Sequence, residues 1–291
     1  MSELSEYIKE RAKSGPVYMP YLTAGDPDFS KTVEYALAMI DQGADLLELG
    51  IPFSDPTADG PVIQKAMFRA LNNGAFSLEK VFETARAIHE ARPQVPLIFL
   101  TYLNPILTGF LKRVPGNDAL RSQFDVNRNI EDFLKECQNA GIKGVVIPDL
   151  PHEQPEARVF RALAPQYGVD QILMIAPNTE KKRFKEICKL AGGFIYNVTS
   201  MGVTGERKEL PRELGATIRR IKKSSGVPVL AGFGISEPEQ VKSLVGILDG
   251  IIVGSLNHRI IEESISGNGT SDAVSALAEK TRGFVEACRG N

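Results

Sequence analysis

The sequence predicts an α/β protein whose parallel strands close into a (β/α)8 barrel. Two observations support this fold class. Eight short apolar runs occur along the 291 residues, and a segment with helical periodicity follows each run. The alternative is an open, doubly wound sheet, but the G-x-G-x-x-G turn typical of that fold does not follow the first run, where "YLTAGDPDFS" stands instead.

The elements can be assigned in order. "MSELSEYIKERAKSG" predicts an extra, charged amphipathic N-terminal helix rather than a signal peptide. "FSKTVEYALAMIDQG" and "SLEKVFETARAIHEA" are examples of the helical segments between strands. Because no low-complexity linker divides the chain, we expect residues 1–291 to form a single domain. The predicted strands are 17–22, 45–49, 96–101, 144–148, 171–176, 193–198, 227–232 and 250–254.

Composition excludes several classes of function. The net charge of −2 and the pI of about 6 give no electrostatic footprint for nucleic acid. The three cysteines and three histidines are scattered, at spacings that match neither disulfides nor a metal site. No apolar run is long enough to span a membrane, so we expect a soluble, cytoplasmic protein.

One predicted connection is unusually long. Residues 107–129, "LTGFLKRVPGNDALRSQFDVNRN", run between the third strand and its helix. A tolerated surface insertion is the simpler interpretation. Because the loops that follow strands line the active face of a barrel, a lid or a partner contact is the alternative.

Candidate catalytic residues are sought at the carboxyl ends of the strands. No lysine lies within the apolar runs, and Lys143 is placed just before the fourth, so a Schiff-base mechanism lacks its nucleophile. No histidine ends a strand, and no carboxylate–histidine cluster for a metal is apparent. The remaining candidates are the carboxylates Glu48, Asp55, Asp59 and Asp149.

Glu48 lies between leucines near the end of the second run. Burial there would raise its pKa and suit a proton donor, whereas the alternative is a buried salt bridge. Asp59 precedes Gly60-Pro61, where a helix is predicted to begin, so it could be catalytic or simply a turn or capping residue. Asp55 fits turn chemistry, and Asp149 is interpreted as structural.

Three glycine-bearing turns follow the last three predicted strands. They are "GVTG" at 202–205, "AGFGIS" at 231–236 and "VGS" at 253–255. Glycine lets the backbone approach a ligand closely, and the amides at helix starts favour an anion. Barrels often bind phosphate after strands seven and eight, so the three turns predict a phosphorylated substrate.

With these motifs in view, the sequence resembles the tryptophan synthase alpha chain family from about Pro20 to Glu263. The segments that carry the resemblance are "LELGIPFSDPTADGP", "PYLTAGDP", "TYLNPI", "VVIPDLP", "GVTG" and "GFGIS". The resemblance implies a TIM barrel that cleaves indole-3-glycerol phosphate into indole and glyceraldehyde 3-phosphate. It also implies that a beta chain receives the indole, in an alpha2-beta2 heterotetramer, with pyridoxal phosphate in the beta partner and no cofactor in this chain.

The resemblance also assigns residue roles. It implies that Glu48 donates a proton to the indole ring carbon and can accept the hydroxyl proton, and that Asp59 accepts a hydrogen bond from the ring N–H. The other implied positions are Gly205, Gly234, Gly254 and Ser255 for phosphate, Tyr21, Leu100, Tyr196 and Phe233 for the indole pocket, and Thr204 in a mobile loop. The family's pattern has phenylalanine at Tyr21 in some members and a larger aliphatic residue at Thr57 in many.

Two rival functions share part of the pattern. Another phosphate-binding barrel of indole metabolism, such as indole-3-glycerol phosphate synthase, would use lysines at strand ends, which this chain lacks. A non-catalytic subunit that binds a phosphometabolite would share the glycine turns. It would not need Glu48 in a strand beside an aspartate-bearing loop.

Overall fold

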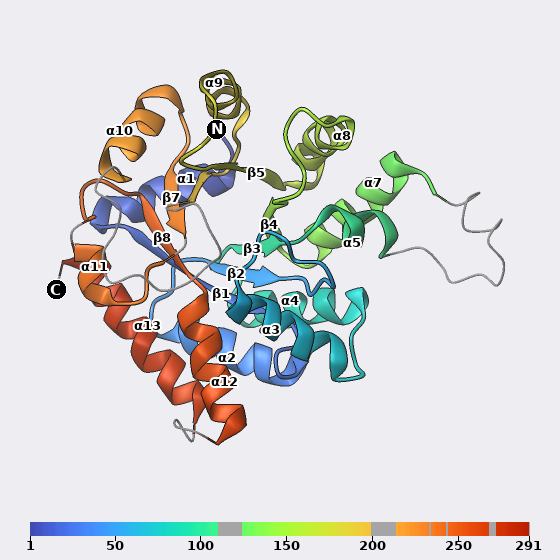
Figure 1. The fold of residues 1–291 in the computed structure, drawn as a ribbon, viewed down its shortest axis with the longest axis vertical. Coiled ribbons are helices and arrows are strands. Elements are labelled where there is room, and N and C mark those ends of the chain that lie inside the picture. The colour runs from blue at the N-terminus through green and yellow to red at the C-terminus, as the bar shows by residue number, and fades with distance from the viewer. Residues whose placement is uncertain (110–123, 199–213, 233, 243, 268–271, 291) are drawn as a thin grey trace.

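The structure is a computed structural model that describes residues 1–109, 124–198, 214–232, 234–242, 244–267 and 272–290. Its strands are all parallel and pair in chain order, and β1 closes the barrel against β8 (Figure 1). This confirms the (β/α)8 TIM barrel and excludes the open sheet. The strands are β1 Val17–Thr23, β2 Leu47–Gly50, β3 Leu97–Leu100, β4 Ile142–Val146, β5 Asp170–Ile175, β6 Ile195–Val198, β7 Val229–Gly232 and β8 Gly250–Val253.

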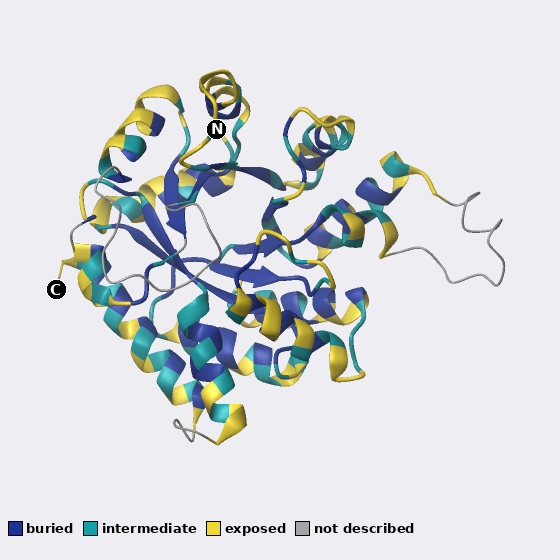
Figure 2. Ribbon diagram, in the orientation of Figure 1, coloured by how far each residue is buried: buried dark blue, intermediate teal, exposed yellow. Residues whose placement is uncertain are grey.

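Helices surround the barrel and expose their outer faces, whereas the strands are buried (Figure 2). The predicted N-terminal helix is present as α1, with the Ser2 side chain capping its first turn. The helices are α1 Glu3–Arg11, α2 Phe29–Asp41, α3 Pro61–Asn72, α4 Leu78–Ala91, α5 Leu103–Thr108, α7 Val126–Asn139, α8 Pro155–Leu163, α9 Lys181–Leu190, α10 Leu214–Ser224, α11 Pro238–Lys242, α12 Ser255–Ser266 and α13 Ala273–Arg289. Within the described ranges, none of these helices combines the length and apolarity needed to cross a membrane.

Strand alternation divides the core into two parts. Leu47 and Leu49 face outward and belong to the cluster that packs against the helices. Alternate side chains such as Ile98 and Leu230 face inward and form a separate buried cluster that fills the barrel. Glu48 lies between the two leucines, so it faces the barrel interior.

Ion pairs close the amino-terminal end of the barrel. Asp45, whose side chain is fully buried, accepts hydrogen bonds from Arg11 of α1 and Arg289 of α13. The prediction that Lys143 precedes the fourth strand was wrong, because it is the second residue of β4. Its Nζ lies 3.4 Å from Glu3 of α1 and therefore points away from the catalytic face. These charges stabilise the fold and leave the opposite end of the barrel available for chemistry.

The long connection after β3 is described only in part. α5 ends at Thr108 and α7 begins at Val126, with Asp125 capping α7 through hydrogen bonds from the backbone N–H groups of Asn127 and Arg128. Residues 110–123 lie outside the described ranges. The structure therefore places the two ends of the predicted insertion, and its role stays a prediction.

Candidate active site

Glu48 is a buried carboxyl group on β2. Its Cα is paired in register with Tyr21 of β1 and Ile98 of β3, and the residue is 1% exposed. Within the described part of the chain, its Oε1 has no hydrogen-bond partner and its carboxylate forms no salt bridge. The alternative of a salt bridge to a neighbouring strand is therefore wrong. Burial, and to a smaller extent the charge of Asp59, raises the pKa of Glu48 to about 8.

Asp59 reaches the same site from the loop after β2. It is 5% exposed, and its Oδ2 accepts a hydrogen bond of 2.6 Å from the Tyr102 hydroxyl. Burial raises the pKa of Asp59 to about 6, although the Tyr102 hydrogen bond acts in the opposite direction. Gly60 is the N-cap of α3 and Pro61 its first residue, so the Asp59 side chain does not cap the helix. The capping alternative is therefore wrong.

The two buried carboxyl groups have different pKa values. Between pH 6 and pH 8, Glu48 is mostly protonated while Asp59 is mostly ionised. Pairs of titratable groups whose environments separate their pKa values are typical of acid–base sites. The site can therefore donate a proton from one residue and stabilise positive charge with the other.

Tyrosines form the walls around these carboxylates. Three of the residues predicted for the indole pocket, Tyr21, Leu100 and Tyr196, are 4–5% exposed and belong to the inward-facing cluster. Burial raises the pKa of Tyr196, and the nearby charges of Glu48 and Asp59 raise it further. Burial, and after it the charges of Asp59 and Glu48, likewise raise the pKa of Tyr21, so both tyrosines lie beside the acid pair. Phe233, the fourth predicted wall residue, lies outside the described ranges.

Sequence reasoning missed three residues at this site. Tyr102 follows β3 and binds Asp59, although its motif "TYLNPI" had already been noted. Gly50 and Gly232 leave room for two hydroxyl groups, because a Cβ on either glycine would collide with the hydroxyl of Tyr21 or Tyr196. Glycines that precede turns at strand ends could have indicated this close approach.

The predicted phosphate site is partly described. Gly234 follows β7 with φ +85°, and Gly254 follows β8 as the N-cap of α12. Ser255 is the first residue of α12, so its turn presents helix amides. Because β7 and β8 are paired, the two turns are neighbours. Gly205 and Thr204 lie outside the described ranges.

Two other carboxylates have structural contacts. Asp149 accepts a hydrogen bond of 2.9 Å from the backbone N–H of Leu103, which braces the start of α5 against the loop after β4. Asp55 accepts a hydrogen bond of 2.5 Å from the Ser54 hydroxyl in an exposed turn. Both contacts agree with the structural interpretation of these residues.

No carboxylate–histidine cluster for a metal was apparent from the sequence, but the described residues include one candidate group. His152, Glu153 and Glu186 place potential ligand atoms within 4.8 Å of one another. Glu186 is on α9, far along the chain, so spacing alone could not show the group. The two carboxylates lie 3.2 Å from Nδ1 and 3.0 Å from Nε2, on different sides of the ring, so this arrangement suits a histidine between two acids.

Comparison with known proteins decides the family. The sequence profile described as tryptophan synthase alpha chain matches residues 7–115 and 123–289. The chain belongs to the tryptophan synthase alpha chain family. The chain is 43% identical over 267 residues to the tryptophan synthase alpha chain of Leptospira interrogans, covering 91% of this chain and 94% of that protein. It is 40% identical over 269 residues to that of Petrotoga mobilis, covering 92% and 94%.

Solved structures of tryptophan synthase agree with this assignment. The alpha subunit from Legionella pneumophila strain Paris superposes with a TM-score of 0.80 at 30% identity, over 100% of both chains. A chain of the tryptophan synthase complex from Pyrococcus furiosus superposes with a TM-score of 0.76 at 33% identity, over 93% of this chain and 98% of that one. As a tryptophan synthase alpha chain, the protein is a lyase that cleaves indole-3-glycerol phosphate in tryptophan biosynthesis, and its family works with a beta chain.

Proposed function

We propose that Glu48 and Asp59 catalyse the retro-aldol cleavage in a single barrel domain formed by residues 1–291. This proposal rests on the two buried carboxyl groups that one strand and its loop supply. Glu48, with a pKa of about 8, is protonated at neutral pH, whereas Asp59, with a pKa of about 6, is ionised. A side chain whose pKa lies near the working pH is suited to general acid–base catalysis.

In the proposed reaction, Glu48 gives one proton to the substrate and takes one back. Glu48 protonates the indole ring carbon that carries the glycerol phosphate, and the resulting positive charge spreads to the ring nitrogen. Asp59 accepts a hydrogen bond from the ring N–H and stabilises this charge. The side-chain hydroxyl then loses its proton to the Glu48 carboxylate as the carbon–carbon bond breaks. The products are indole and glyceraldehyde 3-phosphate, and Glu48 is again protonated.

The proposed binding residues lie around this pair. Tyr21, Leu100, Tyr196 and Phe233 would hold the indole ring, while Gly205, Gly234, Gly254 and Ser255 would hold the phosphate, with Thr204 in the mobile loop. The inward packing of the first three and the paired turns after β7 and β8 support this division. An apolar ring and an anion would then occupy separate parts of the carboxyl face of the barrel.

For the partner, we propose docking of the beta chain over the carboxyl face in an alpha2-beta2 assembly. The ring of Phe68 on α3 is 68% exposed beside a groove that Phe53, Pro56 and Thr57 also line. An exposed aromatic next to an apolar groove is typical of an interface anchor. Pyridoxal phosphate would be held by the beta chain alone, and the complex would be cytoplasmic.

The test is an indole-release assay on Glu48→Gln, with the isolated chain and with a beta chain added. The amide keeps the shape of the side chain but cannot transfer the proton. We expect kcat to fall at least a hundredfold, within the usual range for loss of a general acid, while glycerol 3-phosphate still binds. Glu90→Gln, at an exposed position on α4, is the matched control. Retention of more than about a tenth of the wild-type kcat would exclude Glu48 from the acid–base role.

A further inference from the structure

Strand β1 continues beyond the point where its pairing with β8 ends. The β1–β8 register stops at Pro20 paired with Val253, whereas β1 remains paired with β2 as far as Thr23. The chain after β8 turns at Gly254 and enters α12 at Ser255. On that side, no strand in the described ranges lies beside the last three residues of β1.

Two side chains from the first turn of α12 replace the missing strand. Asn257 Nδ2 donates to the carbonyl oxygens of Tyr21, at 3.3 Å, and Val253, at 2.9 Å. The backbone N–H of Thr23 donates to His258 Nε2 at 3.0 Å. Both α12 residues are buried, at 1% and 0% exposure. Buried backbone groups need such partners, so these bonds hold the end of β1 to the start of α12.

The hydrogen bonds determine the tautomer of His258. Because Nε2 accepts from Thr23, the ring proton is assigned to Nδ1, which lies 3.1 Å from the carbonyl oxygen of Gly254 and donates to it. Burial also lowers the pKa of His258, which favours this neutral form. One imidazole ring therefore connects the end of β1 to the N-cap of α12.

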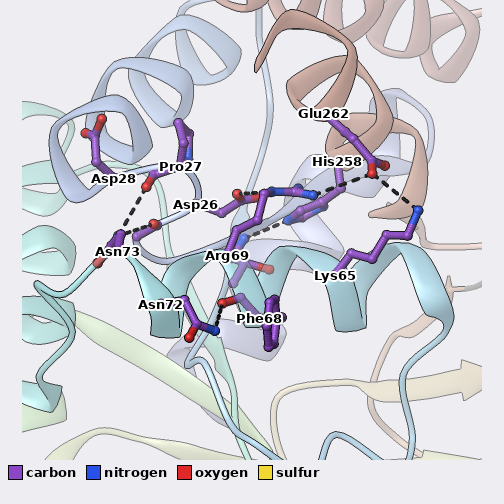
Figure 3. A network of polar contacts seen from close by, with 12 residues as sticks. Asp26, Pro27, Asp28, Lys65, Phe68, Arg69, Asn72, Asn73, His258 and Glu262 are labelled. Atoms are coloured by element: carbon purple, nitrogen blue, oxygen red, sulfur yellow. Dashed lines mark hydrogen bonds and ion pairs between the residues drawn. The ribbon is translucent and has the colours of Figure 1, made fainter. Parts of the chain in front are cut away.

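Charged groups enclose the outer side of this ring. Arg69 of α3 forms two 2.8 Å hydrogen bonds to the buried carboxylate of Asp26, and its guanidinium lies 3.8 Å from Glu262 of α12. Figure 3 shows these side chains meeting His258 between the two helices. His258 is thus held between the ion pair and the barrel wall, and it has little freedom to turn.

These contacts connect the two ends of the proposed substrate site. The Tyr21 ring lies 5.3 Å from the His258 ring, and its hydroxyl lies 3.2 Å from the hydroxyl of Thr23. A Cβ on Gly254 would lie 3.1 Å from Cδ1 of Tyr21. The aromatic wall and the phosphate turn are therefore in direct contact, and Asn257 and His258 hold both from behind.

We propose that Asn257 and His258 are positioning residues that set the spacing between the indole wall at Tyr21 and the phosphate turn at Gly254. This inference rests on the proposed function, because it takes Tyr21 and Gly254 as parts of one substrate site. Both residues act through their contacts with Tyr21, Thr23, Val253 and Gly254. Their loss should leave each half-site able to bind its own fragment but should misalign a substrate that spans both, and small misalignments lower rates strongly.

The experiment compares fragments with the whole substrate in His258→Leu and Asn257→Leu. Binding of indole and of glycerol 3-phosphate is measured separately, and kcat/KM is measured for indole-3-glycerol phosphate. We expect each fragment to bind within about twofold of wild type, while kcat/KM falls about tenfold or more. His89→Leu, the same change at a half-buried histidine on α4, should alter neither quantity.

Two conservative variants separate the contacts of His258. Glutamine places an oxygen near Nε2 and can still accept from Thr23, whereas asparagine reaches only the Gly254 carbonyl. We expect His258→Gln to retain most of the wild-type kcat/KM and His258→Asn to resemble His258→Leu. If the leucine variants do not fold, as judged by the loss of a cooperative thermal unfolding transition, the proposal is tested by the difference in kcat/KM between His258→Gln and His258→Asn.

Other outcomes would overturn the inference. Equal loss of fragment and substrate binding would show a general structural role, and an unchanged kcat/KM would show no role in alignment. If the wild-type chain itself neither binds glycerol 3-phosphate nor cleaves the substrate, the proposed function fails, and the positioning role fails with it. If the wild-type enzyme binds glycerol 3-phosphate and cleaves the substrate, but the variants do not show the expected loss of kcat/KM with retained fragment binding, only the positioning role is rejected.

Discussion

The Tyr102 hydroxyl donates a 2.6 Å hydrogen bond to Asp59 and accepts a 3.0 Å hydrogen bond from the backbone N–H of Ala58. Tyr102 follows β3, whereas Asp59 lies in the loop after β2, so one phenol ties two neighbouring active-face loops together. Phe53 from the same β2 loop stacks on the Tyr102 ring at 5.1 Å. Tyr102 therefore orients the carboxylate that is proposed to stabilise the charged ring.

Tyr102→Phe should reduce kcat/KM by about tenfold, the equivalent of one hydrogen bond to a charged group. The hydroxyl lowers the pKa of Asp59, so its removal should raise that pKa further. The acidic limb of the pH–rate profile should then move to higher pH. The measurement is kcat/KM against pH for both proteins. An acidic limb at the same pH in both proteins would show that the hydrogen bond does not lower the pKa of Asp59.

The wild-type pH profile should be bell-shaped. Activity requires ionised Asp59 and protonated Glu48, so the limbs of kcat/KM should lie near pH 6 and pH 8. Asp59→Asn should be severely impaired. In the residual activity the acidic limb should disappear, and the alkaline limb should move to lower pH because the Asp59 charge contributes to the raised pKa of Glu48. Normal turnover with a lower melting temperature would make Asp59 a structural residue instead.

Glu48→Gln should change the pH dependence of stability. The folded-state pKa of Glu48 is about 8 against an ordinary value of 4.5, so the folded protein binds more protons between these values. The contribution of Glu48 to stability is therefore fully present below pH 4.5 and is lost as the pH rises through 8. The loss is on the order of 5 kcal/mol. The neutral amide avoids this loss. Denaturant unfolding at pH 5 and pH 9 should show a benefit of Glu48→Gln at pH 9 only, and an equal effect at both values would contradict the buried-acid assignment.

Ser255→Glu should test the phosphate site more cleanly than changes at its glycines. Gly234 has a positive φ that strains other residues, and a side chain on Gly254 would press on Tyr21. A glutamate at the first position of α12 suits the helix dipole, so the fold should be retained. Its charge should weaken glycerol 3-phosphate binding by at least about tenfold and leave indole binding unchanged. Calorimetry with the two ligands measures this, and equal losses would contradict the phosphate assignment.

The segment 107–129 should affect pairing rather than catalysis. We predict that replacing residues 112–123 by a short Gly/Ser link, which retains the Asp125 cap of α7, leaves basal cleavage within about threefold, a change of less than 1 kcal/mol in the barrier. Activation by the cognate beta chain should change. Collapse of basal cleavage in a folded variant would identify a lid, and no change in either property would identify a tolerated insertion.

The barrel and the acid pair could be predicted from the sequence alone, because both depend on patterns among residues that are close along the chain. Eight apolar runs with intervening helical periodicity indicate parallel strands, and their order follows from the chain. Glu48 and Asp59 are close in sequence, on one strand and its loop. Because the active sites of TIM barrels lie at the carboxyl ends of the strands, the two residues could be predicted to share one site. The role of each carboxylate remained open between catalysis and structure.

Only the tertiary structure shows what surrounds each carboxylate. Burial raises the pKa of Glu48, and Gly60 rather than Asp59 is the N-cap of α3. Asp59 instead accepts a hydrogen bond from Tyr102, 43 residues away in the sequence. His258 meets Thr23 across 235 residues, because closing the barrel brings the last strand beside the first. Spacing and periodicity report neighbours along the chain, whereas desolvation and hydrogen bonding depend on neighbours in space.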